Sequence, residues 1–126
     1  MIAPAQDYWN VLGNRWVRAE ECDFVTRLMF MQQMHKTYAG TSTVCTGVAS
    51  KLPGTIVYEM ARQECQERLA TFFGHPGGVI ETEAKVELDG NTWRAARATV
   101  ARTARRIMEG YVFVPSWAEH LEIAAE

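Results

Sequence analysis

The sequence of 126 residues is poor in cysteine, has no long apolar run and carries no large excess of charge. Its three cysteines, Cys22, Cys45 and Cys65, are odd in number and lack metal-pair spacing, so we expect free thiols in a reducing cytoplasm. No apolar run approaches the length of a membrane span, and no basic-then-apolar leader follows Met1, so neither a membrane anchor nor an export signal is expected. A net charge of −2 argues against a dedicated nucleic-acid binder.

What is present is the composition of an ordinary globular protein. Hydrophobic residues make up 48% of the chain and charged residues 22%, values that suit a folded domain with a modest core. No internal repeat, low-complexity tract or interdomain linker is visible. We therefore expect residues 1–126 to form a single domain.

One stretch of small and hydroxyl residues, from Tyr38 to Gly54, has the pattern of a ligand-binding turn. A short helix is predicted over residues 43–52, ended by Pro53-Gly54. Free backbone N–H groups at a helix start attract anions such as carboxylates, and a thiol in the first turn, here Cys45, is favoured as thiolate. Packing alone also explains a helix that begins with Ser or Thr, and the two interpretations carry about equal weight.

A longer helix is predicted from Glu21 to Tyr38. Acidic residues stand at its start, and the apolar positions Phe24, Leu28, Met31, His35 and Tyr38 recur with helical spacing. His35 then lies beside the buried stripe, either as a hydrogen-bonded core residue or as a site residue. Its neighbour Lys36 either supplies positive charge to that site or complements the helix C-terminus.

The rest of the chain has the pattern of strands and turns. Residues 5–20 suit an irregular connection or a weak hairpin, and Asp89-Gly90 is the strongest hairpin signal. Arg94 and Arg97 are expected to face the glutamates of the preceding strand. The turn at Gly74–Gly78 contains His75, which serves either as a turn residue or as a ligand-facing donor. The other predicted elements are strands at Ile2–Pro4, Thr55–Tyr58, Leu69–Phe73, Ile80–Leu88, Thr92–Val100 and Gly110–Pro115, a polar loop at Arg62–Glu67, and a helix at Trp117–Ala125 capped by Ser116.

Five separated segments resemble the C-terminal part of the PrpF family, which includes 2-methylaconitate cis-trans isomerase and related Δ-isomerases. They are Met31-Gln-Gln-Met-His-Lys, Thr43-Val-Cys-Thr-Gly-Val-Ala, Leu52-Pro-Gly-Thr-Ile-Val, Gly74-His-Pro-Gly-Gly-Val-Ile and the run from Arg102 to Pro115. The resemblance implies one half of a diaminopimelate-epimerase-like fold, which is an α+β structure with a curved, mostly antiparallel sheet around a central helix. In that fold the ligand lies between two such halves.

The resemblance also implies a set of site residues. Cys45 and then His35 would be the candidate acid and base, without metal or organic cofactor. The residues expected to bind substrate are Lys36, Thr41, Ser42, Thr43, His75 and Gly77. Two positions depart from the family pattern: Lys36 stands where Arg is frequent, and Gly77 where Ser is frequent. Lysine does not copy a bidentate guanidinium, and glycine offers no hydroxyl.

Two functions remain open from sequence. The first is isomerisation of an unsaturated tricarboxylate by cis-trans change or allylic proton shift, with the second wall of the cleft coming from a missing N-terminal half or a second copy. The second is a non-catalytic half-domain that dimerises and at most binds small anions. Family members are about three times as long, so the chain is a fragment, a natural half-length product or one half of a homodimer. No nucleic-acid or membrane partner is expected.

Overall fold

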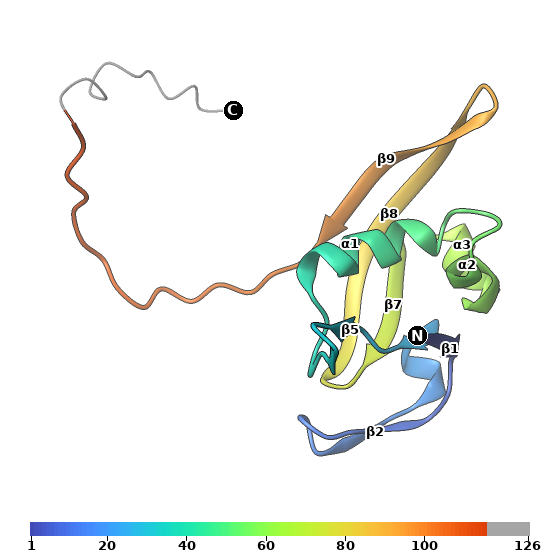
Figure 1. Cartoon of the computed structure of the whole chain (residues 1–126), viewed down its shortest axis with the longest axis horizontal. Coiled ribbons are helices and arrows are strands. Elements are labelled where there is room, and N and C mark those ends of the chain that lie inside the picture. The colour runs from blue at the N-terminus through green and yellow to red at the C-terminus, as the bar shows by residue number, and fades with distance from the viewer. Residues whose placement is uncertain (116–126) are drawn as a thin grey trace.

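The computed structural model of the chain describes residues 1–115, which fold around a five-stranded sheet (Figure 1). The strand order is β1-β4-β7-β8-β9, and all neighbours are antiparallel except β4 and β7. The sheet strands are β1 (Ile2–Pro4), β4 (Phe24–Thr26), β7 (Ala70–His75), β8 (Gly78–Asp89) and β9 (Thr92–Val100). Two small hairpins accompany it: β2 (Tyr8–Asn10) with β3 (Arg15–Val17), and β5 (Met29–Phe30) with β6 (Gln33–Met34). The described helices are η1 (Ala19–Glu21), α1 (Gly40–Ala49), α2 (Ile56–Met60) and α3 (Gln63–Glu67).

The helix α1 lies across one face of the curved sheet, so the predicted α+β class is confirmed (Figure 1). Gly47 of α1 is buried against Thr82 of β8. A Cβ added at Gly47 would lie 2.7 Å from Thr82 Cγ2. The Thr82 hydroxyl donates to the carbonyl of Thr99, so the side chain is held in place. The small residues of α1 therefore set how closely the helix packs.

The predicted helix from Glu21 to Tyr38 is wrong. Phe24–Thr26 form the strand β4, which is buried at all three residues because it lies between β1 and β7. A strand covered on both faces shows no polar alternation, so its apolar positions matched a helical spacing by coincidence. Met31 and Gln32 adopt positive φ values of 47° and 63° and form the tight turn between β5 and β6, which no continuous helix permits.

Three further local expectations are corrected. Thr55–Tyr58 do not form a strand: the Thr55 hydroxyl accepts the N–H of Tyr58 at 3.1 Å and caps α2. Residues 62–67 are not a loop, because α3 occupies Gln63–Glu67. Gly110–Pro115 are extended but unpaired with any strand among the described residues. The expected cap at Ser116 and the helix at Trp117–Ala125 lie outside the described residues.

The strands predicted at Leu69–Phe73, Ile80–Leu88 and Thr92–Val100 are confirmed, as is the hairpin at Asp89-Gly90. The predicted pairing of arginines with glutamates is also found: Arg97 lies 2.6 Å from Glu83 and Arg94 lies 3.6 Å from Glu87. The expected weak hairpin in residues 5–20 is β2–β3. The predicted helix at 43–52 exists but begins earlier, at Gly40, and ends at Ala49.

The core is small and lies between α1 and the sheet. Phe24 and Phe73 stack with ring centroids 5.4 Å apart, and Tyr38 meets Phe73 edge to face at 5.1 Å. Lys51 is buried beside this core, where its ammonium donates to the carbonyls of Cys65, Arg68 and Ala70. The ammonium also lies 3.5 Å from the Cys65 sulfur, and these contacts tie the end of α1 to the α3–β7 connection. Burial lowers the pKa of Lys51.

Candidate functional site

The turn between β7 and β8 presents a buried histidine at one end of the sheet. His75 is 6% exposed, and its Nδ1 accepts the N–H of Gly77 at 3.1 Å. Burial, with smaller contributions from the positive charges of Arg27 and His35, lowers the pKa of His75 to about 4. At neutral pH the imidazole is therefore uncharged, and with Nδ1 accepting, its proton resides on Nε2. His75 can donate one hydrogen bond, but it carries no positive charge.

A pocket of about 400 Å³ opens beside this turn. It is lined by Val11, Leu12, Met34, His35, Lys36 and Pro76. The β5–β6 hairpin brings His35 and Lys36 to it, in place of the predicted helix end. The Nδ1 of His35 accepts the N–H of Thr37 at 3.1 Å, which fixes the ring orientation. An apolar basin with an imidazole and one ammonium suits a ligand with an alkyl part and a carboxylate.

Thr37 connects the pocket to the turn at His75. A Cβ added at Gly77 would lie 3.1 Å from Thr37 Cγ2 and 3.1 Å from His75 Cε1. The three segments are thus in contact, and His35, Lys36, His75 and Gly77 are brought into one neighbourhood. A serine at position 77, as in the family pattern, would require these neighbours to move by a few tenths of an ångström.

The start of α1 lies three residues beyond Thr37, within about 11 Å for an extended chain. Its N-cap, Ala39, makes no side-chain cap hydrogen bond. The first N–H groups, those of Gly40, Thr41 and Ser42, have no acceptor within the helix by virtue of α-helical geometry. Thr43 is different: it is buried and its hydroxyl donates to the Ala39 carbonyl at 3.0 Å. Thr43 therefore supports the helix start and has its hydroxyl already committed.

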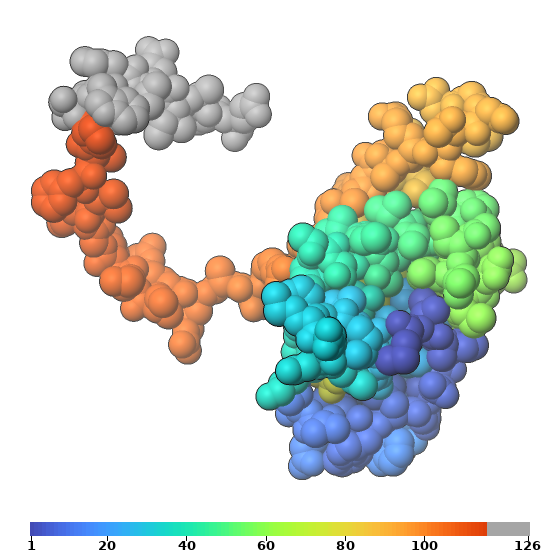
Figure 2. Space-filling view, viewed as in Figure 1, coloured from blue at the N-terminus to red at the C-terminus, as the bar shows by residue number. Residues whose placement is uncertain are grey.

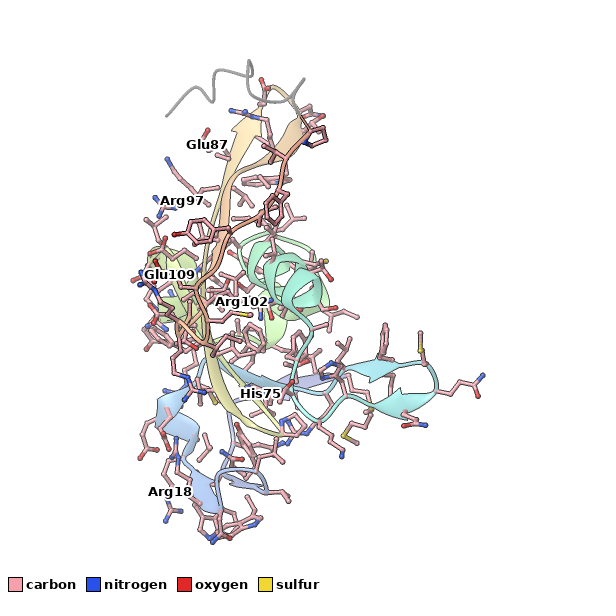
Figure 3. The ribbon with its side chains drawn as sticks, turned by 90° about the vertical axis from the view of Figure 1, so that its left-hand side faces the viewer. Arg18, His75, Glu87, Arg97, Arg102 and Glu109 are labelled. Carbon is pink, nitrogen blue, oxygen red and sulfur yellow. The ribbon has the colours of Figure 1, made fainter. Side chains whose placement is uncertain are left out.

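Arg102 is not among the site residues expected from the sequence. The guanidinium lies directly over Gly40, because a Cβ added there would be 1.7 Å from its Nη2 (Figure 3). A guanidinium beside free N–H groups forms an anion-binding arrangement. Only the close approach of Gly40, which has no side chain, allows this placement, and no local sequence signal predicts it.

Cys45 is exposed on α1 and lies in its second turn. The expectation that it lies in the first turn is wrong because α1 begins three residues earlier than predicted. The field of a helix end falls off within the first turn, so the helix contributes less to the reactivity of this thiol than the sequence suggested. Thr41, four residues earlier, lies on the same outward side of the helix.

Another pocket, of about 410 Å³, is lined by Glu20, Glu21, Cys22, Asp23, Arg62, Glu64, Arg68 and Phe72. Its charges already satisfy one another in part, since Arg68 lies 2.5 Å from Asp23 and Arg62 donates to the Ala19 carbonyl at 2.8 Å. The excess of carboxylates makes this pocket unsuited to an anionic ligand. Within residues 1–115 no group of three His, Cys, Asp or Glu residues has the arrangement of a metal site. In the same range, no helix has the length and apolar character needed to cross a membrane.

Comparisons with known proteins match this fold. The chain is 40% identical to a solved methylitaconate-delta-isomerase, with a TM-score of 0.73 over 100% of this chain and 31% of that one. The fold is therefore of the type found in that isomerase, an α+β structure with a curved sheet. The family model described as PrpF protein matches residues 1–115. The chain belongs to the PrpF family.

Two relatives are named isomerases. The 3-methylitaconate isomerase of Eubacterium barkeri is 46% identical over 90% of this chain and 28% of its own length. The 2-methyl-aconitate isomerase of Shewanella oneidensis is 35% identical over the same shares. The chain thus spans about a quarter of these relatives. The expectation that it is the C-terminal part of the family is not matched by the comparisons, because short motifs identify a family without fixing a position along a much longer chain.

Proposed function

We propose that this chain supplies one wall of the active site of a PrpF-type isomerase, acting on a small unsaturated carboxylate such as 3-methylitaconate or 2-methylaconitate. The observation that carries the proposal is the 46% identity to 3-methylitaconate isomerase over 90% of the chain. The reaction is an allylic proton shift, or a cis-trans change through it. A base removes a proton next to the conjugated double bond, and an acid returns one across the allyl system.

The start of α1 suits the substrate carboxylate. When the proton is removed, negative charge spreads onto that carboxylate. The N–H groups of Gly40, Thr41 and Ser42 and the guanidinium of Arg102 are already oriented before this charge develops. Preoriented donors of this kind lower the barrier because they need no reorganisation during the reaction. Lys36 in the adjacent pocket and the neutral His75 in the turn beside that pocket bind a second polar group of the substrate.

The proton transfer itself is assigned to Cys45 first and His35 second. Cys45 is an exposed thiol on α1, whereas Cys22 and Cys65 are buried. His35 lines the pocket. Both lie on the wall that this chain provides. A reaction with one group on each face of the substrate requires a second wall, supplied by another polypeptide or a further part of the protein. Catalysis by a single isolated copy is therefore expected to be absent or weak.

A binding experiment tests the carboxylate site apart from turnover. Itaconate is titrated into ¹⁵N-labelled protein, and the amide shifts of Gly40, Thr41 and Ser42 are followed by NMR. We expect saturable shifts in the wild type and a loss of affinity of about tenfold or more in Arg102→Ala, because a charge-assisted contact is removed. Arg105→Ala is the matched control, since it removes an exposed arginine of the same segment. Equal affinity in Arg102→Ala, or no shifts at the start of α1, contradicts the carboxylate site.

A turnover experiment tests the chemistry. Isomerisation of 3-methylitaconate and 2-methylaconitate is followed by ultraviolet absorbance, with Cys45→Ala, His35→Gln and the control Cys22→Ala. Loss of turnover in Cys45→Ala but not in Cys22→Ala supports the assignment. Undiminished turnover in both Cys45→Ala and His35→Gln contradicts it.

The alternative is a non-catalytic module that dimerises and binds small anions. The observation in its favour is that the chain spans only 28% of the relatives' length, too little to include both walls of a cleft. Saturable itaconate binding without turnover at any protein concentration would support this alternative over the isomerase.

A further inference from the structure

The hairpin β2–β3 packs against the rest of the body at one end of the molecule (Figure 2). From β2 the hydroxyl of Tyr8 donates to the carbonyl of Gly78, 70 positions further along the chain. Gly78 is the first residue of β8 and pairs with His75, the last residue of β7. The phenol therefore contacts the turn at the pair of residues that closes it.

The ring of Tyr8 has a defined position beside this turn. A Cβ added at Gly74 would lie 2.7 Å from Tyr8 Cε1 and 3.0 Å from Val25 Cγ1, so only glycine lets the ring edge lie against β7 at this point. The Arg27 guanidinium lies over the ring, 5.0 Å from its centroid. Burial raises the pKa of the Tyr8 phenol, so the hydroxyl stays a donor at neutral pH. Contacts within residues 1–115 alone thus fix both the ring and its hydroxyl.

The turn itself needs an outside contact to keep one shape. Gly77 and Gly78 follow Pro76, and Gly78 adopts a φ of 135°, which side chains other than glycine rarely permit. Two adjacent glycines also lose much backbone freedom when they become ordered. The hydrogen bond from Tyr8 ends on the second glycine, and the N–H of the first donates to His75 Nδ1 at 3.1 Å. Fixing Gly78 therefore favours the turn in which Nδ1 accepts and the proton stays on Nε2.

We propose that Tyr8 is a positioning residue of the candidate site: its hydroxyl holds the β7–β8 turn so that the Nε2–H of His75 keeps the orientation in which it donates to the substrate. Tyr8 does not line the pocket formed around His35 and Lys36, so it acts through His75 and not by touching the ligand. The role of His75 towards substrate rests on the proposed function, whereas the contact between Tyr8 and the turn does not.

The charges around His75 agree with this arrangement. Burial first, and then the positive charges of Arg27 directly after β4 and His35 directly after β6, lower the pKa of His75. Lys36 is the cation of the neighbouring pocket. Because Arg27 lies over the Tyr8 ring, the residue that holds the turn also contacts a group that keeps the imidazole neutral. A neutral imidazole with its proton on Nε2 is a donor of one fixed direction.

NMR of the His75 ring tests the proposal in the protein without ligand. Tyr8→Phe keeps the aromatic ring and removes only the hydrogen bond to Gly78. With the turn released, we expect the pKa of His75 to rise from about 4 towards 6.5 and its ring nitrogens to show both neutral tautomers. The matched control is Trp9→Phe in the same strand, because Trp9 packs edge to face on Trp16 at 5.7 Å. This control should leave both signals of His75 unchanged.

Two results of these measurements overturn the proposal. One is an unchanged pKa and tautomer of His75 in folded Tyr8→Phe, and the other is an equal change in Trp9→Phe, since a general loosening of the hairpin affects both variants alike. The ¹⁵N spectrum of each variant verifies its fold. The wild type gives a measurement that needs no variant: nuclear Overhauser contacts from the Tyr8 ring to the Hα protons of Gly74 are expected, and their absence overturns the proposal as well.

Itaconate binding separates this proposal from the proposed function. In Tyr8→Phe we expect the affinity to fall by about threefold or more, with the amide shifts of Gly40, Thr41 and Ser42 still present, because only the second polar contact is impaired. Wild-type affinity in Tyr8→Phe overturns the positioning role. If the wild type itself binds no itaconate, the proposed function fails, while the His75 measurements without ligand still decide whether Tyr8 fixes the ring.

Discussion

One buried residue at the end of the sheet, His75, makes the stability of the fold depend on pH. His75 is buried without a compensating acid, and its Nδ1 accepts a backbone N–H, so folding favours the neutral imidazole. The pKa of His75 falls from 6.5 to about 4 on folding. Between these two pH values the unfolded chain binds a proton at His75 that the folded chain does not bind. The stability that the neutral imidazole contributes is therefore fully present above pH 6.5 and is lost as the pH falls towards 4.

We expect the free energy of unfolding to decrease by roughly 3 kcal/mol at most from pH 7 to pH 4 because of this histidine. Urea titrations at several pH values measure the decrease. His75→Gln removes the titrating group, so its pH profile should be flatter over this range. His35→Gln keeps His75 and should retain the slope. Parallel profiles for wild type and His75→Gln would show that the folded pKa is not depressed.

Arg102 shows how a single residue changes its role with its surroundings. In the sequence it belongs to a basic run with Arg105 and Arg106. In the structure only Arg102 meets the start of α1, at Gly40, whereas Arg106 pairs with Glu109 at 3.1 Å. Its assignment to a carboxylate site therefore rests on one tertiary contact.

At the scale of elements, the position of α1 depends on one small residue facing the sheet. Gly47 leaves no room for a methyl group because the held Thr82 side chain fills the space. We expect Gly47→Ala to destabilise the fold by about 1–3 kcal/mol through overpacking, despite the better helix propensity of alanine. Thermal or urea unfolding measures this.

The double variant provides the control for that prediction. Removing the Thr82 methyl and hydroxyl leaves its Cβ 3.5 Å from the new methyl, an ordinary contact distance. Gly47→Ala in the Thr82→Ala background should therefore cost less than Gly47→Ala alone. Equal costs in both backgrounds would contradict the contact.

Two hairpins bring the candidate site residues together. β5–β6 delivers His35 and Lys36, and the β7–β8 turn delivers His75 and Gly77. The sequence singled out all four positions as candidates, but the wrong helix from Glu21 to Tyr38 gave His35 a different setting. Periodicity recorded the apolar positions correctly; it did not reveal that a central strand buries both of its faces.

At the scale of the whole molecule, the proposed isomerase needs a second wall for its cleft besides the one that this chain supplies. The apolar side chains of Val11, Leu12, Met29, Phe30 and Met34 are more than half exposed around the pocket. An apolar rim of this kind suits a surface that another polypeptide covers. The proposed isomerase leads to the expectation that the functional unit contains more than one copy or a further polypeptide.

If a second copy completes the cleft, activity per chain should rise with protein concentration and reach half of its maximum near the dimer dissociation constant. Progress curves over a dilution series, together with sedimentation at the same concentrations, measure both quantities. A constant low activity across the concentration range would contradict a cleft completed by a second copy, and the second wall would then come from another polypeptide.

The sequence by itself determined the family, the α+β class, the β7–β8–β9 meander and most of the candidate residues. These follow from local signals: the alternation of apolar and polar residues in the strands, the strong turn signal at Asp89-Gly90, and the short segments that resemble the family. Only the tertiary structure decided where α1 begins, that β4 is a buried parallel neighbour of β7, and that Arg102 meets Gly40. Each of these depends on contacts between residues far apart in the chain, and such contacts leave no periodic trace in the sequence.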